Sequence, residues 1–327
     1  MTDPLFIPFA CPRCHALLEL SSPDEMVCPV DRLLFRRIDQ VWRMLLPERE
    51  PVYRTFIQEY EAIRRAEGRG SPLAEYYRSL PYRDLSGRMA GDWRIRSASF
   101  DAFIQHILQP MEALSGRPLS VLDLGAGCGW LSNRLAGRGH SVAAVDLLIN
   151  NFDGLGCWRF YETAFTPLQA EFDQLPFLEQ SFDLIIFNAS LHYSTHYETT
   201  FQETLRVLRP PGKLVVLDSP VYQDVTSGME MVRERERRFV KQYGFPSNAL
   251  PSENYLTYQK LAELTARYHL HSQILTPFYG LSWILRPLKA RLLGQREPAK
   301  FHLVVLSSAA GKEEAGPEMT GLPEKTL

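Results

Sequence analysis

Short apolar runs alternate with helical patterns from residue 120 onward. The runs read "SVLDL" (120–124), "SVAAVDL" (141–147), "LQAEF" (168–172), "FDLIIF" (182–187), "KLVVLD" (213–218) and "FHLVVL" (301–306). Runs that are apolar at successive positions are typical of strands buried on both faces of a sheet. Their alternation with helical segments predicts an α/β fold with a doubly wound, mostly parallel sheet.

An amphipathic helix is predicted directly before the first of these runs. Apolar residues there recur every three or four positions, at Phe100, Phe103, Ile104, Ile107, Leu108, Met111 and Leu114. Ser97 or Ser99 is the expected N-cap, and Gly116 is the expected end of the helix. Residues 51–96 mix Arg, Glu and Tyr with Gly and Pro, and we expect a connector that contains a helix near 52–67.

Two further segments are expected as insertions that cover the site like lids, at about 221–256 and 279–300. The first contains a helical pattern over 228–244 that ends at Gly244. The second interleaves apolar with basic residues, so it either rests on a membrane surface or packs on the sheet with its charges in water. The tail, 309–327, is rich in Gly, Glu and Pro and is expected to be disordered.

Composition and charge restrict the class of protein. The chain has 327 residues, 45% of them hydrophobic, and a formal net charge of -2, so no global basic field attracts nucleic acid or an anionic membrane. The N-terminus lacks a basic segment followed by an apolar run, and no stretch is long and apolar enough to span a bilayer. We therefore expect a cytoplasmic protein, which agrees with cysteine usage unlike that of a disulfide framework.

Three of the five cysteines lie near the N-terminus. Cys11 and Cys14 form one C-x2-C pair, and after thirteen intervening residues Cys28 begins a C-x2-D pair with Asp31. Two such pairs at this separation can hold zinc tetrahedrally, with a carboxylate as the less common fourth ligand. His15 is the competing fourth ligand, and a metal-free knuckle held by its own apolar residues is the alternative.

A glycine-rich turn follows the run at 120–124. In "VLDLGAGCGW", Gly125, Gly127 and Gly129 allow the backbone to turn tightly and to approach a small ligand closely. Trp130 stands where a dinucleotide-binding G-x-G-x-x-G motif would need its third glycine, which counts against a dehydrogenase. Asp146 ends the next apolar run.

Four ordered motifs over roughly 115–220 resemble those of the class I S-adenosylmethionine-dependent methyltransferases of type 11. They are "VLDLGAGCGW" with Asp146, "AEFDQLPF", "SFDLIIFNASLHYS" and "RVLRPPGKLVVLDS". The resemblance implies a Rossmann-like, seven-stranded sheet, a methyltransferase domain over 97–308, and S-adenosylmethionine as cofactor. The cofactor-binding residues that it implies are Asp123, Gly125, Ala126, Gly127, Gly129, Asp146, Leu147, Glu171, Phe172 and Asn188.

Within that set, the resemblance implies particular roles. Asp146 would accept hydrogen bonds from both ribose hydroxyls. Glu171 would meet the adenine amino group, with Phe172 beside the ring. Asp123 would hold the loop and the amino end of the methionine part, and an arginine among Arg94 and Arg96 would pair with its carboxylate.

Residues 10–50 resemble the small zinc-ribbon activator subunit of tRNA, rRNA and release-factor methyltransferases, and more closely its bacterial relatives, whose second knuckle also reads C-x2-D. The resemblance implies a zinc-ribbon domain over 1–50 with Cys11, Cys14, Cys28 and Asp31 as ligands of a structural zinc. These fifty residues contain six arginines, no lysine and eight acids. Such a charge balance makes a poor clamp for nucleic acid.

The acceptor of the methyl group is expected over the ends of the fourth and fifth strands. His192 and Tyr193 are the candidate catalytic residues there, with packing as the alternative for the histidine. The leading hypothesis is a methyltransferase for a small-molecule or lipid acceptor, with the ribbon fused in cis and a peripheral membrane contact through 279–300. An RNA methyltransferase and a non-catalytic scaffold are the alternatives, and the oligomeric state is left open.

Overall fold

A single sheet runs through the molecule. The computed structural model describes residues 7–308, and the expected disordered tail lies outside them. The strand order is β1-β2-β3-β4-β7-β6-β5-β8-β9-β13-β12. The strands from β4 through β7, β6, β5 and β8 to β9 pair in parallel, whereas β13 is antiparallel to both β9 and β12. The expected Rossmann-like α/β fold is confirmed, but the sheet as a whole is mixed.

The strands of this sheet are short. Their bounds are β1 (Glu19–Ser22), β2 (Glu25–Val27), β3 (Leu34–Ile38), β4 (Val41–Arg43), β5 (Ser120–Leu124), β6 (Ser141–Asp146), β7 (Thr166–Gln169), β8 (Phe182–Asn188), β9 (Leu208–Leu217), β12 (Leu270–Leu275) and β13 (Leu303–Ser308). A separate two-stranded ribbon pairs β10 (Val221–Tyr222) with β11 (Leu256–Thr257).

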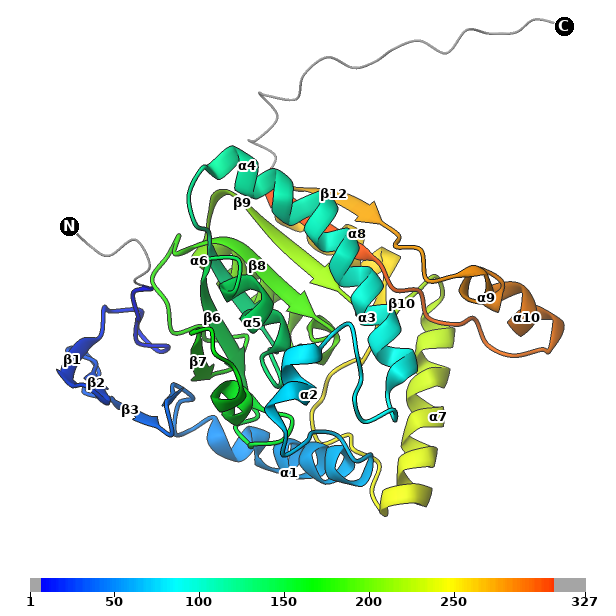
Figure 1. The fold of residues 1–327 in the computed structure, drawn as a ribbon, viewed down its shortest axis with the longest axis horizontal. Helices are drawn as coiled ribbons and strands as arrows, with labels where there is room; N and C mark the ends of the chain where they lie inside the picture. The colour runs from blue at the N-terminus through cyan, green and yellow to red at the C-terminus, as the bar shows by residue number, and fades with distance from the viewer. Residues whose placement is uncertain (1–6, 309–327) are drawn as a thin grey trace, which may run out of the picture.

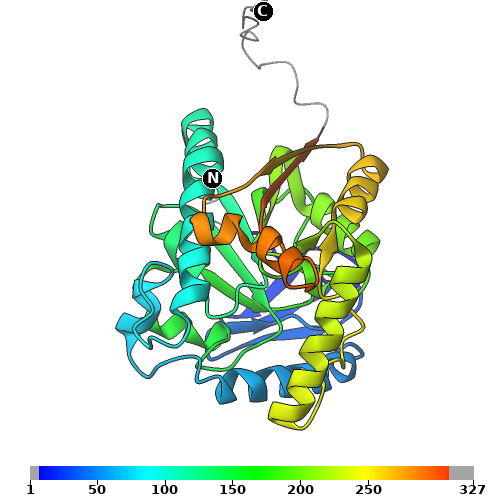
Figure 2. The same ribbon diagram turned by 90° about the vertical axis from the view of Figure 1, so that its right-hand side faces the viewer.

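Helices cover both faces of the sheet (Figures 1 and 2). Their bounds are α1 (Glu50–Ala66), α2 (Ala74–Ser79), α3 (Ala90–Phe103), η1 (Ile104–Leu108), α4 (Gln109–Ser115), α5 (Trp130–Ala136), η2 (Leu155–Phe160), η3 (Leu191–Tyr193), α6 (Tyr197–Val207), α7 (Val225–Tyr243), α8 (Tyr258–Arg267), α9 (Leu281–Ile284) and α10 (Arg286–Leu292). Of these, α3 and α5 pack on one face, and α6 and α8 pack on the other.

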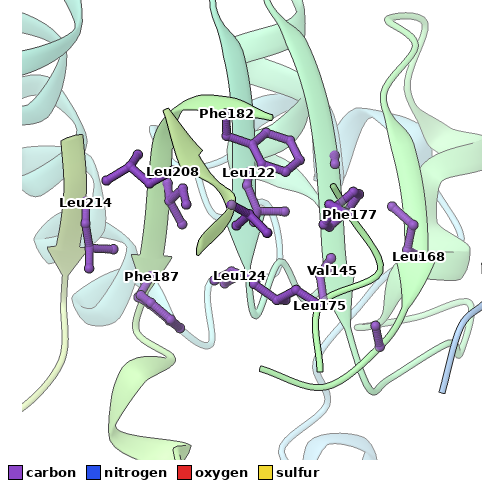
Figure 3. Close-up of a cluster of buried hydrophobic side chains, with 14 of the residues drawn as sticks. Leu122, Leu124, Val145, Leu168, Leu175, Phe177, Phe182, Phe187, Leu208 and Leu214 are labelled. Atoms are coloured by element: carbon purple, nitrogen blue, oxygen red, sulfur yellow. The ribbon is translucent and has the colours of Figure 1, made fainter. Parts of the chain in front are cut away.

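Successive residues of the central strands enter different cores, because side chains alternate across a strand. In β5, Leu122 and Leu124 join the cluster that holds α6 and α8, whereas Val121 joins the cluster under α3 and α5. Figure 3 shows part of the first cluster, in which Phe182 and Phe187 of β8 approach the side chains of neighbouring strands. Burial on both faces explains why these strands read as continuous apolar runs.

The N-terminal module, which we define as residues 7–49, extends the sheet beyond β7. Its last strand pairs in parallel with β7, with Trp42 opposite Leu168. A second contact forms at Phe9, whose backbone bridges to Phe177 and whose ring lies 6.0 Å from the Phe177 ring. Most of the buried apolar side chains of the module belong to the same cluster as the strands of the large domain. The module is therefore packed on the domain.

The helix expected from Ser97 or Ser99 begins earlier, so this N-cap prediction was wrong. The backbone is helical from Ala90, and it continues through a π-turn, η1, to Ser115. The Ser97 hydroxyl donates to the Arg94 carbonyl within the helix, and Ser99 donates to Asp218. These hydroxyls have partners other than the free N–H groups of a helix start. The predicted end is confirmed, since Gly116 adopts φ 60°.

Both expected insertions contain helices. The first contains α7, which begins after the N-cap Asp224 and ends at Gly244 with φ 88°. The second contains α9 and α10, which extend from the body of the molecule beside α7 (Figure 1). Among the described residues, no helix combines the length and apolar character needed to cross a bilayer.

Candidate active site

A cavity opens where the parallel strands β5, β6 and β8 end. This edge is where ligands bind in open α/β sheets. Nine of the residues expected at the site line the cavity, namely Gly125, Ala126, Gly127, Asp146, Leu147, Glu171, Phe172, Asn188 and Tyr193. Asp123, Gly129 and His192 do not line it.

The glycine-rich loop after β5 is held by Asp146. The carboxylate of Asp146 accepts the Gly127 N–H at 2.7 Å on Oδ2 and the Leu148 N–H at 2.8 Å on Oδ1. Gly125 has φ 78°, and a Cβ there would come within 2.3 Å of the Ser190 Cβ. Only glycine fits that close approach. The loop backbone is thereby fixed at the cavity wall.

Burial alters the pKa values of two acids near this loop. Burial raises the pKa of Asp146 to about 6, although the N–H groups of Leu148 and Gly127 favour its charged form. Burial likewise raises the pKa of Asp123 to about 7, opposed by the hydrogen bond from Ser132. That hydroxyl donates to Asp123 Oδ2 at 2.7 Å, while Oδ1 is buried without a partner among the described residues.

Glu171 is held by residues from the start of α1. Arg49 donates from Nε and Nη2 to its two carboxylate oxygens at 2.7 and 2.6 Å, and the Tyr53 hydroxyl donates at 2.5 Å. The Glu171 side chain is only 2% exposed. A buried carboxylate needs such partners to stay charged. The sequence did not indicate this contact between the end of the N-terminal module and the cavity.

Replacing Arg49 with methionine is expected to lower the free energy of unfolding by about 3 kcal/mol, because Glu171 would stay buried without its charged partner. Urea denaturation of the wild-type and Arg49→Met proteins measures the change.

Arg13→Met is the matched control for this variant. Arg13 pairs with Glu48 in the same module, but both side chains are exposed, so little change is expected. Equal effects of the two substitutions would contradict the role of the buried pair.

Aromatic side chains of α1 form a second wall of the cavity. Phe56 and Tyr60 lie one turn apart, and each packs against Tyr193, with ring centroids 6.0 and 6.1 Å away; all three line the cavity. Arg64 stacks on Tyr60 and pairs with Asp153 at 3.2 Å. The segment expected as a connector therefore contributes to the site.

Polar atoms without partners also face or border the cavity. Trp93 and Arg96 of α3 line it, and Arg96 stacks on the Trp93 ring at 4.9 Å. Arg96 has no ion pair within residues 7–308, and the Trp93 Nε1 and Asn188 Oδ1 atoms are buried without hydrogen-bond partners there. Buried polar groups normally have partners, so these atoms are available to a polar ligand.

His192 lies beneath the cavity wall. Burial lowers its pKa to about 3, with further lowering from the charges of Arg235 and Arg96, so the ring is neutral at physiological pH. Its Nδ1 lies 3.2 Å from the Ser219 hydroxyl, and its ring centroid lies 4.3 Å from that of Tyr193. His192 thus supports Tyr193 from behind.

The four residues expected as metal ligands lie together. The ligand atoms of Cys11, Cys14, Cys28 and Asp31 all lie within 4.8 Å of one another. The Cys11 Sγ to Asp31 Oδ2 distance is 3.3 Å, the Cys14 Sγ to Cys28 Sγ distance is 3.4 Å, and the Cys28 Sγ to Asp31 Oδ2 distance is 3.8 Å. A tetrahedron with zinc–sulfur bonds of about 2.3 Å has edges of about 3.8 Å, so the donor set fits a zinc ion.

His15 is turned away from this cluster. Its Nε2 lies 3.7 Å from Glu203 Oε1 on α6. Burial lowers its pKa, with a further contribution from the charge of Arg206. The geometry therefore favours Asp31 over His15 as the fourth ligand.

The central part of the chain is similar to known methyltransferases. Residues 122–216 match the methyltransferase domain family. A polyketide synthase-nonribosomal peptide synthetase, ffsA, of Aspergillus flavipes is 28% identical over 152 residues, 43% of this chain and 4% of that protein. A malonyl-[acyl-carrier protein] O-methyltransferase of Buchnera aphidicola is 33% identical over 97 residues, 30% of this chain and 38% of that enzyme.

The matched segments thus span less than two fifths of these curated relatives. Among solved structures, a 1,6-didemethyltoxoflavin-N1-methyltransferase of Burkholderia thailandensis, determined with 1,6-didemethyltoxoflavin and S-adenosylhomocysteine, is similar. It is 18% identical, with a TM-score of 0.44, and the match covers 89% of this chain and 98% of that one. Residues 122–216 of the present chain are therefore similar to a methyltransferase domain.

Proposed function

We propose that the protein transfers a methyl group from S-adenosylmethionine to a small-molecule or lipid acceptor. The observation that carries the proposal is the cavity at the carboxyl ends of the parallel strands, with a glycine loop fixed on the Asp146 carboxylate. The glycine loop and Asp146 lie within residues 122–216, which match the methyltransferase family. A bound sulfonium cofactor would supply an electrophilic methyl group, and the protein would mainly place the acceptor in line with it.

The cavity offers suitable partners for each part of the cofactor. The carboxylate of Asp146 would receive the ribose hydroxyls. The methionine carboxylate would meet Arg96 and the Trp93 indole N–H, and the free Asn188 Oδ1 would receive the amino group. The backbone of Gly125 and its neighbours would line the part of the cofactor between the ribose and the methionine carboxylate.

The adenine end would meet a preorganised carboxylate. Glu171 lines the cavity beside Phe172, but Arg49 and Tyr53 already donate to both of its oxygens. Oε2 already accepts from both residues, but Oε1 accepts only from Arg49 Nε and can accept a further hydrogen bond. The adenine amino group would thus find an acceptor whose orientation is fixed. In this proposal the last residue of the N-terminal module positions a cofactor-binding side chain.

The acceptor would lie beside Tyr193, which lines the cavity next to Ser194 and Thr195. We propose Tyr193 as the residue that orients the acceptor. His192 is outside the cavity and neutral, so we assign it a supporting role beneath that ring. The name of the Buchnera relative, a malonyl-[acyl-carrier protein] O-methyltransferase, is compatible with a small acceptor.

We further propose that the N-terminal module is a zinc ribbon with a structural metal. The module has little apolar core of its own, because Leu17, Leu34 and Ile38 are about half exposed, and its buried residues pack on the large domain. Cys11, Cys14, Cys28 and Asp31 would hold the ion and fix the two knuckles. The ribbon would then act as an activator in cis, by supporting β4 and Arg49.

Isothermal titration of S-adenosylmethionine into the full chain tests the proposed function. We expect binding near micromolar affinity, followed by methyl transfer to an extract of small molecules and lipids but not to RNA. A folded, zinc-loaded protein that binds no S-adenosylmethionine would overturn the proposal and favour the scaffold alternative. RNA binding that weakens steeply with salt, together with RNA methylation, would favour the RNA methyltransferase alternative.

Cofactor affinity is expected to depend on pH through Asp146. Ribose hydroxyls donate to the ionised carboxylate, whose pKa is raised by burial to about 6. In the folded protein without cofactor, the pKa of Asp146 is higher than in the unfolded chain. Its ionised form therefore destabilises the fold above about pH 6, and this destabilisation is lost as the pH falls and the acid is protonated. Affinity should fall about tenfold per pH unit below about pH 6.

Titrations between about pH 5 and pH 8 measure this dependence. Asp146→Asn is the control, since a neutral amide removes this titrating group and should flatten the profile apart from the contribution of Asp123, whose pKa is raised to about 7. A wild-type affinity that is constant over this range would refute the assignment.

A further inference from the structure

The segment around α9 and α10 exposes a concentrated group of large apolar side chains. Their exposed fractions are 69% for Phe278, 73% for Leu281, 59% for Ile284, 56% for Leu285, 56% for Leu288, 77% for Leu292 and 58% for Leu293. Figure 1 shows the two short helices extending from the body of the molecule. Contiguous apolar surface of this kind usually marks a docking site.

The apolar residues form one stripe. Within α10, at about 100° per residue, Leu288 and Leu292 fall in one arc of about 40°. Leu281, Ile284 and Leu285 keep the same spacing of three to four residues through α9 and the residue that follows it. Lys289 and Arg291 fall on the two sides of that arc. Lys289 and Arg291 are exposed, and neither forms an ion pair within residues 7–308. The stripe is therefore apolar at its centre and cationic along both margins.

Few side chains of α9 and α10 pack against the rest of the protein. Ala290 is 8% exposed, and the Trp283 ring lies 5.2 Å from Tyr279 and 5.6 Å from Phe301. Arg286 stacks on Trp283 at 3.8 Å. The alternative expected from the sequence, a cap helix with its apolar side packed on the sheet, does not describe this segment, because the leucines face outward.

The charge of the segment favours an anionic partner for the stripe. Residues 279–296 contain four basic residues and no acid, in a chain whose net charge is -2. Arg296 is paired with Glu234, at 2.8 Å, so Arg286, Lys289 and Arg291 remain as cations without acidic partners in the described structure. Leucine beside lysine and arginine suits the boundary between anionic headgroups and acyl chains.

The segment is anchored beside the cavity. The Tyr279 hydroxyl lies 2.8 Å from the Ser99 hydroxyl, which donates to Asp218 directly after β9. The backbone of Ala189, which lines the cavity, donates to the Leu217 carbonyl at the end of the same strand. The exposed stripe and the cavity therefore share one edge of the sheet.

We propose that α9 and α10 dock the protein on the surface of an anionic lipid bilayer. The leucine stripe enters the interfacial layer, and Lys289 and Arg291 contact lipid phosphates. This inference concerns where the protein docks, and it holds whether or not the acceptor is a lipid.

Co-sedimentation with vesicles tests the docking surface. Wild-type protein should bind vesicles made of phosphatidylglycerol and phosphatidylcholine in about equal parts, and should bind pure phosphatidylcholine weakly. The Lys289→Glu/Arg291→Glu variant should lose at least about 25-fold in partitioning, about fivefold per charge. Leu288→Asp/Leu292→Asp should lose at least about tenfold.

Leu114→Asp is the matched control, because Leu114 of α4 is 88% exposed away from the stripe. It should bind vesicles like the wild type, and all variants should retain the wild-type circular dichroism spectrum. Absence of wild-type binding, or variants that bind as well as the control, would overturn the proposal. Sedimentation equilibrium without vesicles tests whether a second copy of the chain occupies the stripe. A wild-type dimer that the Leu288→Asp/Leu292→Asp variant dissociates would assign the stripe to that second copy and would also overturn the proposal.

Discussion

Asp146→Ala should weaken S-adenosylmethionine binding by at least about a hundredfold. The substitution removes two charge-assisted hydrogen bonds to the ribose, each contributing about 1.5–3 kcal/mol. It also frees the Gly127 and Leu148 N–H groups that the carboxylate now accepts at 2.7 and 2.8 Å. The glycine loop would lose its fixed position, so methyl transfer should fall with binding. Isothermal titration calorimetry measures the change.

A surface aspartate provides the control for this variant. Asp24 pairs with Arg37 in the N-terminal module with a side chain that is 59% exposed, and Asp24→Ala should bind the cofactor like the wild type. An Asp146→Ala protein that is folded and binds with wild-type affinity would remove Asp146 from the cofactor site.

Cys28→Ser should release the metal and destabilise the whole protein. Cys28 is fully buried, and its Sγ lies 3.4 Å from that of Cys14. A hydroxyl is a poor zinc ligand, and the metal-binding free energy of such sites is part of the folding free energy. We expect zinc content to fall from about one per chain to nearly none, and Tm to fall by roughly 10 °C or more. Elemental analysis and calorimetry provide the two readouts.

Three further variants separate metal loss from ordinary core damage. Cys157→Ala also removes a buried sulfur, but outside the cluster, so it should keep its zinc. Asp31→Ala should lose zinc, whereas His15→Ala should retain it, because His15 faces Glu203. A zinc-loaded Asp31→Ala protein would show that the fourth ligand is another group.

The fold could be predicted where sequence pattern and burial coincide. In β5, Val121 and Leu122 face opposite cores, so both are apolar and the strand reads as one run. The extension of the sheet by β4 could not be predicted in this way. β4 is three residues long, and its pairing with β7 depends on positions more than a hundred residues away.

The candidate site was predictable in part for a similar reason. Gly125 and Gly127 lie in one short motif and Asp146 ends the next strand, and they meet at the cavity because adjacent parallel strands end together. Arg49 and Tyr53 reach Glu171 across about 120 positions, so no local pattern connects them. The sequence nevertheless contains a signal that α1 contributes to the site.

That signal is the aromatic stripe of α1. Tyr53, Phe56 and Tyr60 recur at helical spacing, and Arg64 continues the row one turn later. Such a stripe usually packs in a core, but here Phe56 and Tyr60 line an open cavity. Because a helical stripe identifies a face and not what that face contacts, the sequence alone could not distinguish these two roles.

The pairing of β4 with β7 also bears on the synthesis of the chain. An uncovered edge strand readily pairs with other chains. Trp42 leaves the ribosome well before its register partner Leu168, so the strand that covers this edge exists before the edge itself. A nascent chain that includes the N-terminal module can therefore shield β7 as soon as it forms, whereas a chain translated without the module exposes that edge to its neighbours from the start.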